Sequence, residues 1–361
     1  MIFSNKISSL FLTKSKHSEH YPALDGLRGA AILIVLLGHT SNEHIYIHKM
    51  INLERASKIG VYLFFLLSAY LLDRQIIKAL IEKKNNIHFW KNYLLRRVLR
   101  IYPLFILSLM IFFLLKKINL VEKNWDATEI LSHLFLIKGD YVFWSISVEF
   151  KYYILSPFLL IIIHKHLHWN IRSTLIFLFI LIVISLIVTI YFELPLDSFI
   201  RYLPIFLTGT ILSLLEILKP DKFKKLTAKI IFNYIVIISI LTIIILIPFY
   251  FKMIFGIKHD IRLPYYYCPY AILFSFLIVS VKYKDNLIKK VFELKALRFI
   301  GIISYSIYLF HMFFLELSIM IQVPDYLRIY IFFIITVIFC SVSYLTIEKQ
   351  MAKIRLRDMV S

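Results

Sequence analysis

Long, continuously apolar segments separated by short polar ones run along almost the whole chain. The segment TLIFLFILIVISLIVTIYF, for example, is apolar over about 19 residues, the length that a helix needs to cross the hydrocarbon core of a bilayer. These segments do not alternate between apolar and polar residues as the strands of a membrane β-barrel do. The pattern therefore predicts an all-α, polytopic membrane helix bundle.

We expect about ten transmembrane helices. A shorter apolar piece at 130–137 cannot cross a bilayer and is interpreted as a surface or re-entrant segment. No period repeats along the chain, and no loop exceeds about 25 residues, so a second soluble domain is not expected. The predicted spans are 23–41, 58–78, 97–116, 142–163, 172–192, 198–217, 229–250, 265–283, 300–321 and 327–347.

Composition agrees with a membrane protein. Hydrophobic residues make up 60% of the chain and the mean hydropathy is +0.77, whereas soluble domains are roughly 45–50% apolar. The formal net charge is +20. With the N-terminus inside, the inner segments carry 25 Lys and Arg residues and the outer loops carry 8. By the positive-inside rule, both termini are expected to be cytoplasmic, and the basic charge needs no nucleic-acid partner.

The expected organisation is a single membrane-embedded domain over 1–361. It comprises a cytoplasmic segment at 1–22, the ten-helix bundle at 23–347 and a cytoplasmic tail at 348–361. Because the chain ends about fourteen residues after its last predicted span, we expect a stand-alone bundle. The two cysteines, Cys268 and Cys340, fall in or near separate spans without metal-ligand spacing, so no metal is expected.

The first span, LDGLRGAAILIVLLGHT, contains three ionisable residues. A charged group in a membrane helix costs about 2.5–3.5 kcal/mol on insertion scales. Arg28 and His39 are eleven residues apart, so they share a helix face about 16 Å apart along the axis, and Asp25 is close enough to pair with Arg28. Alternatively, Arg28 extends to the inner interface and His39 faces the outer headgroups.

The third span begins with three arginines in LLRRVLRIYP. Arg96 and Arg100 are one turn apart on one face, and Arg97 lies beside them. They form either an ordinary positive-inside cluster or a clamp for a phosphate-bearing ligand, because planar guanidinium groups suit phosphate oxygens.

The fourth span, FWSISVEFKYYILSP, places Glu149 about two turns from its outer end, near the expected depth of His39. A carboxylate at this depth needs a partner, and it could orient a histidine or pair with Lys151. Ser145 and Ser147 precede it on the same span and are candidates for contacts with a substrate.

The ninth span, GIISYSIYLFHMFF, carries Tyr308 one turn before His311. His311 should lie near mid-membrane, as a site residue or as a buried core histidine. Glu348, at the end of the last span, is interpreted as an interfacial charge. Arginines are thus expected on the cytoplasmic side, with histidines and Glu149 deeper and further outward.

Six ordered motifs resemble those of the acyltransferase-3 family of integral membrane acyltransferases, which includes bacterial O-acetyltransferases of surface polysaccharides. The segments that carry the resemblance are LDGLRGAAILIVLLGHT with its Arg-X10-His, GVYLFFLLSAYLL, RRVLRIYPLF, FWSISVEFKYYILSPFLL, ISYSIYLFHM and SYLTIEK. The chain departs from the family pattern at Ser68-Ala69-Tyr70 and at Phe150-Lys151, which affects substrate contacts more than family membership.

The resemblance implies an acyl-CoA donor, usually acetyl-CoA, and a sugar hydroxyl of an envelope glycan as acceptor. It implies that Arg28 and His39 are essential. On this basis we expect Arg28, Arg96, Arg97 and Arg100 to bind the donor, and His39 with Glu149 to catalyse transfer. Asp25, Ser145, Ser147, Tyr308 and His311 are the expected substrate contacts.

The expected partners are acetyl-CoA, an envelope glycan that can be lipid-linked, and the lipid bilayer. The expected location is the bacterial cytoplasmic (inner) membrane, and lipopolysaccharide O-antigen is the first acceptor to consider. A transporter or flippase of a glycan or lipid-linked intermediate is the competing class, since buried ionisable residues also mark transport pathways. The sequence contains no inverted repeat and no matched pair of Gly- or Pro-broken spans, the features that would favour a transporter.

Overall fold

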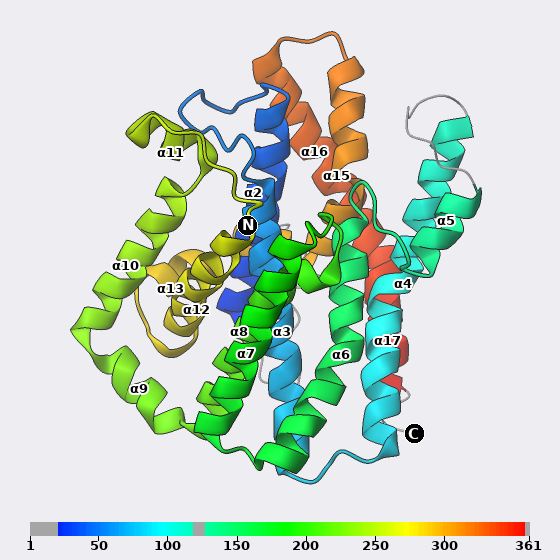
Figure 1. Cartoon of the computed structure of the whole chain (residues 1–361). Helices are drawn as coiled ribbons and strands as arrows, with labels where there is room; N and C mark the ends of the chain where they lie inside the picture. Colours follow the sequence, from blue (N-terminus) through cyan, green and yellow to red (C-terminus); the bar gives the residue numbers. More distant parts are fainter. Residues whose placement is uncertain (1–20, 118–126, 358–361) are drawn as a thin grey trace, which may run out of the picture.

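The computed structural model describes residues 21–117 and 127–357, and every regular element in these ranges is a helix (Figure 1). In the described part of the chain, eight helices are long and apolar enough to span a membrane, and the number rises to ten if each of two bent helix pairs counts as one span. The predicted polytopic bundle is therefore confirmed, whereas the orientation of the termini remains a prediction. The eight spans are α2 (Pro22–Asn42), α3 (Ser57–Ile81), α4 (Ile87–Lys117), α6 (Trp144–Leu167), α7 (Ile171–Tyr191), α8 (Phe199–Leu218), Pro264–Tyr283 and Asp325–Lys353.

The last two of these spans are composite. Pro264–Tyr283 joins a 3₁₀ turn, η1 (Pro264–Tyr266), to α12 (Tyr267–Tyr283). Asp325–Lys353 joins α16 (Asp325–Ser343), a π-helical segment η2 (Tyr344–Glu348) and the start of α17 (Lys349–Arg357). Short helices outside the spans and the bent pairs are α5 (Ala127–Leu134), which includes part of the predicted surface segment, α11 (Pro248–Phe255) and α13 (Leu287–Phe292).

Two pairs of consecutive helices are bent sharply, and one of these bends lies inside a predicted span. α9 (Pro220–Ala228) and α10 (Ile230–Ile245) meet at 84°, and α14 (Lys295–Ile302) and α15 (Ser304–Met320) meet at 78°. The expected continuous span at 300–321 is therefore wrong at its beginning, since the chain turns at Ile303. Apolar composition does not reveal this bend, because apolar residues continue across it in the segment FIGIISYSIYLF.

The centre of the bundle is formed by α2, α3 and α8. Buried residues make up 72% of the apolar window of α3 but only 28% of that of α7. The exposed side chains of α7 are large and apolar, among them Phe179 and Ile187, as expected of a helix that faces lipid. Helices α2 and α15, which carry candidate site residues, each pack against several other helices.

Helix α2 packs very closely against α14 through glycines. A β-carbon added to Gly301 would lie 1.8 Å from the carbonyl oxygen of Asp25, and one added to Gly29 would lie 2.1 Å from that of Leu297. Small residues at such crossings let membrane helices approach backbone to backbone. The contact fixes the position of Asp25 and Arg28, one turn apart on α2, against the α14–α15 bend.

Two buried carboxylates connect the central helices. Asp73 of α3 is fully buried and accepts hydrogen bonds from Tyr152 (2.5 Å), Thr210 (2.7 Å) and Ser156. Glu216 of α8 is likewise buried and interacts with cations and a phenol, namely Lys282 (2.5 Å), Arg74 (3.1 Å) and Tyr70. Buried charges need such partners, and these contacts hold α3, α6, α8 and α12 in register.

Candidate active site

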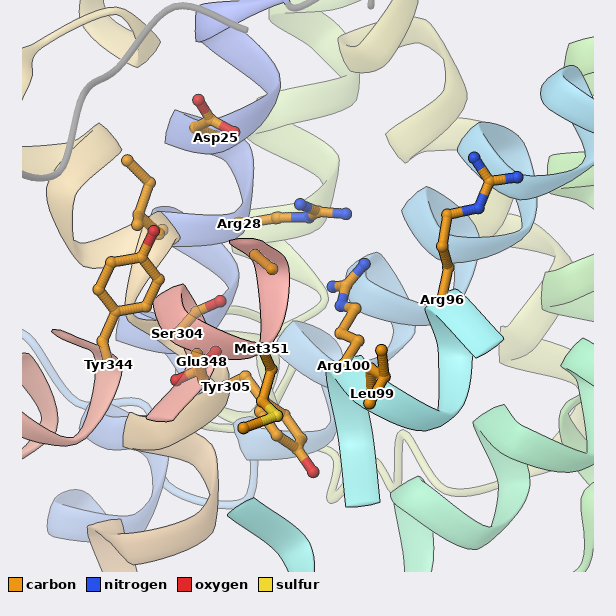
Figure 2. A pocket seen from close by; sticks show the side chains of 13 residues that line it. Asp25, Arg28, Arg96, Leu99, Arg100, Ser304, Tyr305, Tyr344, Glu348 and Met351 are labelled. Carbon is orange, nitrogen blue, oxygen red and sulfur yellow. The ribbon is translucent and has the colours of Figure 1, made fainter. Parts of the chain in front are cut away.

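An arginine-lined cavity of about 260 Å³ opens between α2, α4, the α14–α15 bend and the η2 segment (Figure 2). Arg28 from α2 and Arg100 from α4 extend their guanidinium groups toward the same space. Arg96 also lines the cavity, but it points further away. Asp25 and Glu348 contribute carboxylates to the wall.

A neighbouring cavity of about 240 Å³ shares Asp25, Arg28 and Arg100 with the first one. Arg97 and Tyr153 are among its other lining residues. The structure thus gathers all four of the arginines expected to bind a donor around two adjoining cavities. Arg96 and Arg100, one turn apart on α4, both line the first cavity, while Arg97 lines the second one.

The four arginines differ in the contacts that they make within the protein. The Nε of Arg96 donates to the carbonyl of Asn92 (3.0 Å). The guanidinium carbon of Arg97 lies 5.3 Å from the centre of the Tyr153 ring. Among the described residues, Arg28 and Arg100 make no hydrogen bond and no close ion pair. Their guanidinium groups therefore keep their donors for a ligand.

Glu149 lies with these arginines and not with His39. Its carboxylate accepts hydrogen bonds from Ser68 and Tyr153, and it interacts electrostatically with Arg28, Arg97 and Arg100. No hydrogen bond or ion pair joins it to His39 or Lys151 within the described ranges. The long arginine side chains reach the depth of Glu149, and a carboxylate is stabilised more by cations and hydroxyl donors than by a neutral imidazole.

Glu348 is part of the site, although we expected an interfacial charge. It accepts a hydrogen bond from Ser306 and faces Arg100 across the first cavity. Glu348 ends η2, a π-helical segment, and such segments are frequent at functional sites because they redirect side chains. The sequence gives no simple signal for this register change.

A second kind of cavity, of about 130 Å³, surrounds the two histidines. His39 of α2 and His311 of α15 face each other with ring centroids 5.1 Å apart and planes inclined by 50°. Tyr308, Trp144 and Lys58 complete much of the wall. Ligand pockets are commonly about 300–1,000 Å³, so this one accommodates the reacting end of a substrate but not a whole cofactor.

The hydrogen bonding of His311 determines its tautomer. Its Nδ1 lies 2.8 Å from the carbonyl oxygen of Tyr308, and a carbonyl can only accept, so Nδ1 carries the hydrogen. In the neutral ring the lone pair is then on Nε2, which is buried and has no hydrogen-bond partner among the described residues. His39 is half-buried and makes no hydrogen bond to the described protein.

The candidate serines differ in position. Ser145 interacts with the Tyr308 hydroxyl, near the histidine cavity. Ser147 donates instead to the carbonyl of Leu136 (2.9 Å), which anchors the loop after α5. Of the expected substrate contacts, only Tyr308 and His311 line the histidine cavity, whereas Asp25 lines the arginine cavities.

Helices α2 and α15 each line both kinds of cavity. On α2, Arg28 faces the arginine cavities and His39 the histidine cavity, about 16 Å further along the helix by its rise per residue. On α15, Tyr305 lines the first cavity and His311 the last. The arginine and histidine cavities share no lining residue, so two chemically different sites lie along one pair of helices.

The sequence analysis assigns no role to Lys58, the first residue of the expected second span. In the structure it lies in the first turn of α3 and lines the histidine cavity. No group of three or more His, Cys, Asp or Glu side chains in the described part of the chain is arranged to hold a metal ion.

Comparison with known proteins yields one family. The family model described as "Acyltransferase domain" matches residues 21–348. The chain is similar to "Putative O-acetyltransferase SACOL0978" of Staphylococcus aureus (strain COL), with 28% identity over 94% of this chain and 59% of that protein. It is also similar to "O-acetyltransferase OatA" of Staphylococcus aureus (strain NCTC 8325 / PS 47), with 26% identity over 95% and 59%.

The chain thus spans less than two thirds of the length of these curated relatives. No solved structure matches it. The family match covers all the candidate residues from Asp25 to Glu348, and of the residues that line the arginine and histidine cavities it leaves out only Met351 and Ala352. The chain belongs to the acyltransferase-3 family of integral membrane acyltransferases.

Proposed function

We propose that the protein is a membrane O-acetyltransferase that moves an acetyl group from acetyl-CoA to a sugar hydroxyl of a cell-envelope glycan. The observation that carries this proposal is the arrangement along α2. Arg28 faces cavities rich in arginine, and His39 faces a small cavity with a second histidine. The phosphate-bearing head of acetyl-CoA suits the arginine cavities, and its reacting thioester end suits the histidine cavity about 16 Å away.

The arginine cavities would hold the donor. Arg28 and Arg100 have free guanidinium donors, and planar guanidinium groups bind phosphate oxygens in pairs. Glu149 and Glu348 would act as positioning residues, because their carboxylates attract the guanidinium groups and orient them. The pantetheine arm would then run between α2 and α15 toward His39, which requires the helices to separate slightly, since the cavities share no lining residue.

The histidine cavity would host the transfer. His39 takes the proton of the sugar hydroxyl while the hydroxyl oxygen attacks the thioester carbon. The C–S bond breaks, and the CoA thiolate leaves and takes up a proton. The lone pair on Nε2 of His311 would accept a hydrogen bond that positions the hydroxyl or His39. The Tyr308 phenol would donate to the oxygen that gains negative charge. An acyl-histidine intermediate is the variant mechanism.

The acceptor and the location extend this proposal. Lipopolysaccharide O-antigen is the first acceptor to test, and the bacterial inner membrane is the proposed location, with both termini in the cytoplasm. The donor would then enter from the cytoplasmic side, where the basic segments are expected. A transporter or flippase would also bury ionisable residues, but it has no need of an acyl donor.

The decisive test uses membranes that contain the protein or its His39→Ala variant, acetyl-labelled acetyl-CoA and envelope glycans of the host. Label on the glycan with the wild type alone, released by mild alkali as from an ester, is the expected result. No label with either protein would contradict acetyl transfer to that glycan. Equal label with both would remove His39 from the mechanism.

A further inference from the structure

Lys58 is a cation without a carboxylate partner in the wall of the histidine cavity. It lies in the first turn of α3, and it lines the cavity together with His39, His311 and Trp144. Its ammonium group lies 4.7 Å from the centre of the Trp144 ring and 3.4 Å from the Tyr202 hydroxyl. Among the described residues, no carboxylate lies within ion-pair distance of it.

The contacts of Lys58 leave its charge uncompensated. An aromatic face stabilises an ammonium group without neutralising it. The Tyr202 hydroxyl donates to the carbonyl of Leu196 (2.7 Å), so it can only accept from Lys58. An ammonium group has three N–H donors, and the described protein occupies one of them. The other two are available to a ligand in the cavity.

The charged residues around Lys58 already have partners of their own. Arg201 donates to Tyr267, Leu194 and Arg262. Asp260 forms an ion pair with Arg262 (2.6 Å), and the hydrogen bonds of that guanidinium hold the pKa of Asp260 below its usual range. Asp197 accepts from the backbone N–H of Gly139 (3.4 Å).

This neighbourhood therefore carries three cations and two carboxylates, an excess of one positive charge. Glu316 lies behind Tyr141, whose hydroxyl donates to it (2.8 Å), and the electrostatic contacts of Lys58 do not include it. The first turn of α3 adds to the positive field, because Ala56 caps it without a side-chain hydrogen bond and a helix N-terminus carries partial positive charge.

We propose that Lys58 selects an acceptor whose reacting sugar carries an anionic substituent, a carboxylate or a phosphate. This inference rests on the proposed acetyl transfer and names the substrate class of the same site. Because the cavity holds only the reacting end of the acceptor, the anionic group belongs to the sugar that bears the attacked hydroxyl. A carboxylate or phosphate oxygen accepts the free N–H donors of Lys58 and cancels the excess charge.

The test compares envelope glycans of the host before and after their acidic groups are removed. One sample is amidated with carbodiimide and ammonia to neutralise carboxylates, and another is treated with cold hydrofluoric acid to remove phosphates. Each is offered with labelled acetyl-CoA to membranes that contain the wild type, Lys58→Met, Lys58→Arg or Lys49→Met. Lys49 is an exposed lysine of the loop after α2 and controls for loss of charge in general.

With the wild type, one of the two treatments should lower transfer about tenfold or more, as expected for loss of a charged hydrogen bond. The treatment that does so shows whether the acceptor carries a carboxylate or a phosphate. Lys58→Met should raise the apparent KM for the native glycan by a similar factor and remove the difference between native and treated glycan. Lys58→Arg should restore most of the preference, and Lys49→Met should behave as the wild type. Acetyl-CoA should raise the unfolding temperature of Lys58→Met as it does that of the wild type, which shows that the variant is folded.

Two outcomes would overturn the inference, and they are distinguishable. The selection of an anionic acceptor is overturned if the wild type labels native and treated glycans equally, or if Lys58→Met has a normal KM. Acetyl transfer itself stands in either case. Absence of label on any glycan with the wild type overturns acetyl transfer to these glycans, and the inference with it.

Discussion

The imidazole rings of His39 and His311 face each other at 5.1 Å between centroids, although α2 and α15 lie near opposite ends of the chain. Only His311 has a ring nitrogen anchored to the backbone, through the carbonyl of Tyr308. The two rings are thus unequal: one has a fixed tautomer, and the other is free of hydrogen bonds to the described protein. This inequality suggests different roles and can be tested.

Substitution of the two histidines should have unequal effects on acetyl transfer. We expect His39→Ala to lower kcat by about 100-fold or more, since a general base contributes roughly 10²–10⁴. His311→Gln should lower kcat less, because the glutamine amide can still accept or donate a hydrogen bond. Transfer by the wild type should fall as the pH is lowered, because a protonated imidazole cannot accept a proton, and this limb should disappear in His39→Ala. A larger loss in His311→Gln than in His39→Ala would assign the base to His311 instead.

Arg28 and Arg100 should determine the affinity for the donor. Arg28→Lys or Arg100→Lys keeps the charge but loses the paired donors of the guanidinium group, so the apparent KM for acetyl-CoA should rise about tenfold. Arg172→Lys, in an exposed position in the first turn of α7, is the matched control and should leave KM unchanged. A donor KM that stays constant in all three variants would contradict the arginine cavities as the donor site.

The helices could be predicted closely because their lengths follow from bilayer thickness. The expected span 23–41 is observed as Pro22–Asn42, and 58–78 as Ser57–Ile81. The shared face of Arg28 and His39 follows from the helical repeat alone. The family resemblance stated from the motifs is confirmed by the family model. These features depend on local periodicity or on ordered motifs, which a single sequence displays.

The partners of Glu149 and Glu348 could not be predicted, because they depend on contacts between distant helices. Depth along the span predicts Glu149 near His39, but Glu149 interacts with Arg97 and Arg100 of α4 and with the hydroxyls of Ser68 and Tyr153. Glu348 enters the cavity only because η2 changes the helical register. Side-chain reach and helix irregularity decide such contacts, and neither is encoded in apolar periodicity.

The crossing of α2 and α14 should not tolerate a β-carbon at Gly301. Alanine there would push against the carbonyl oxygen of Asp25, 1.8 Å from the new atom, and overpacking of this kind costs about 1–3 kcal/mol or more. Gly301→Ala should therefore lower the unfolding temperature in detergent. It should also weaken stabilisation by acetyl-CoA, since Asp25 and Gly301 both line the first arginine cavity.

Gly256→Ala provides the comparison for this crossing. No atom lies within 4 Å of a β-carbon added there, and the only penalty comes from its φ of 71°, about 1–2 kcal/mol. It should leave the stabilisation by acetyl-CoA unchanged. If Gly301→Ala behaves in the same way, the close crossing does not shape the cavity.

The buried carboxylate of Asp73 should matter for stability but not for the reaction. Asp73→Ala would leave hydroxyls of Tyr152, Ser156 and Thr210 without their acceptor, and each unsatisfied buried group costs about 1–3 kcal/mol. The unfolding temperature should fall far more than in Asp285→Ala, whose exposed ion pair with Lys289 contributes about 0–1 kcal/mol. Removing the partners as well, in Asp73→Ala combined with Tyr152→Phe and Ser156→Ala, should recover part of the loss. Asp73 lines none of the arginine or histidine cavities, so kcat per folded molecule should stay unchanged. A lower kcat in a stably folded Asp73→Asn variant would instead connect this hydrogen-bond network to catalysis.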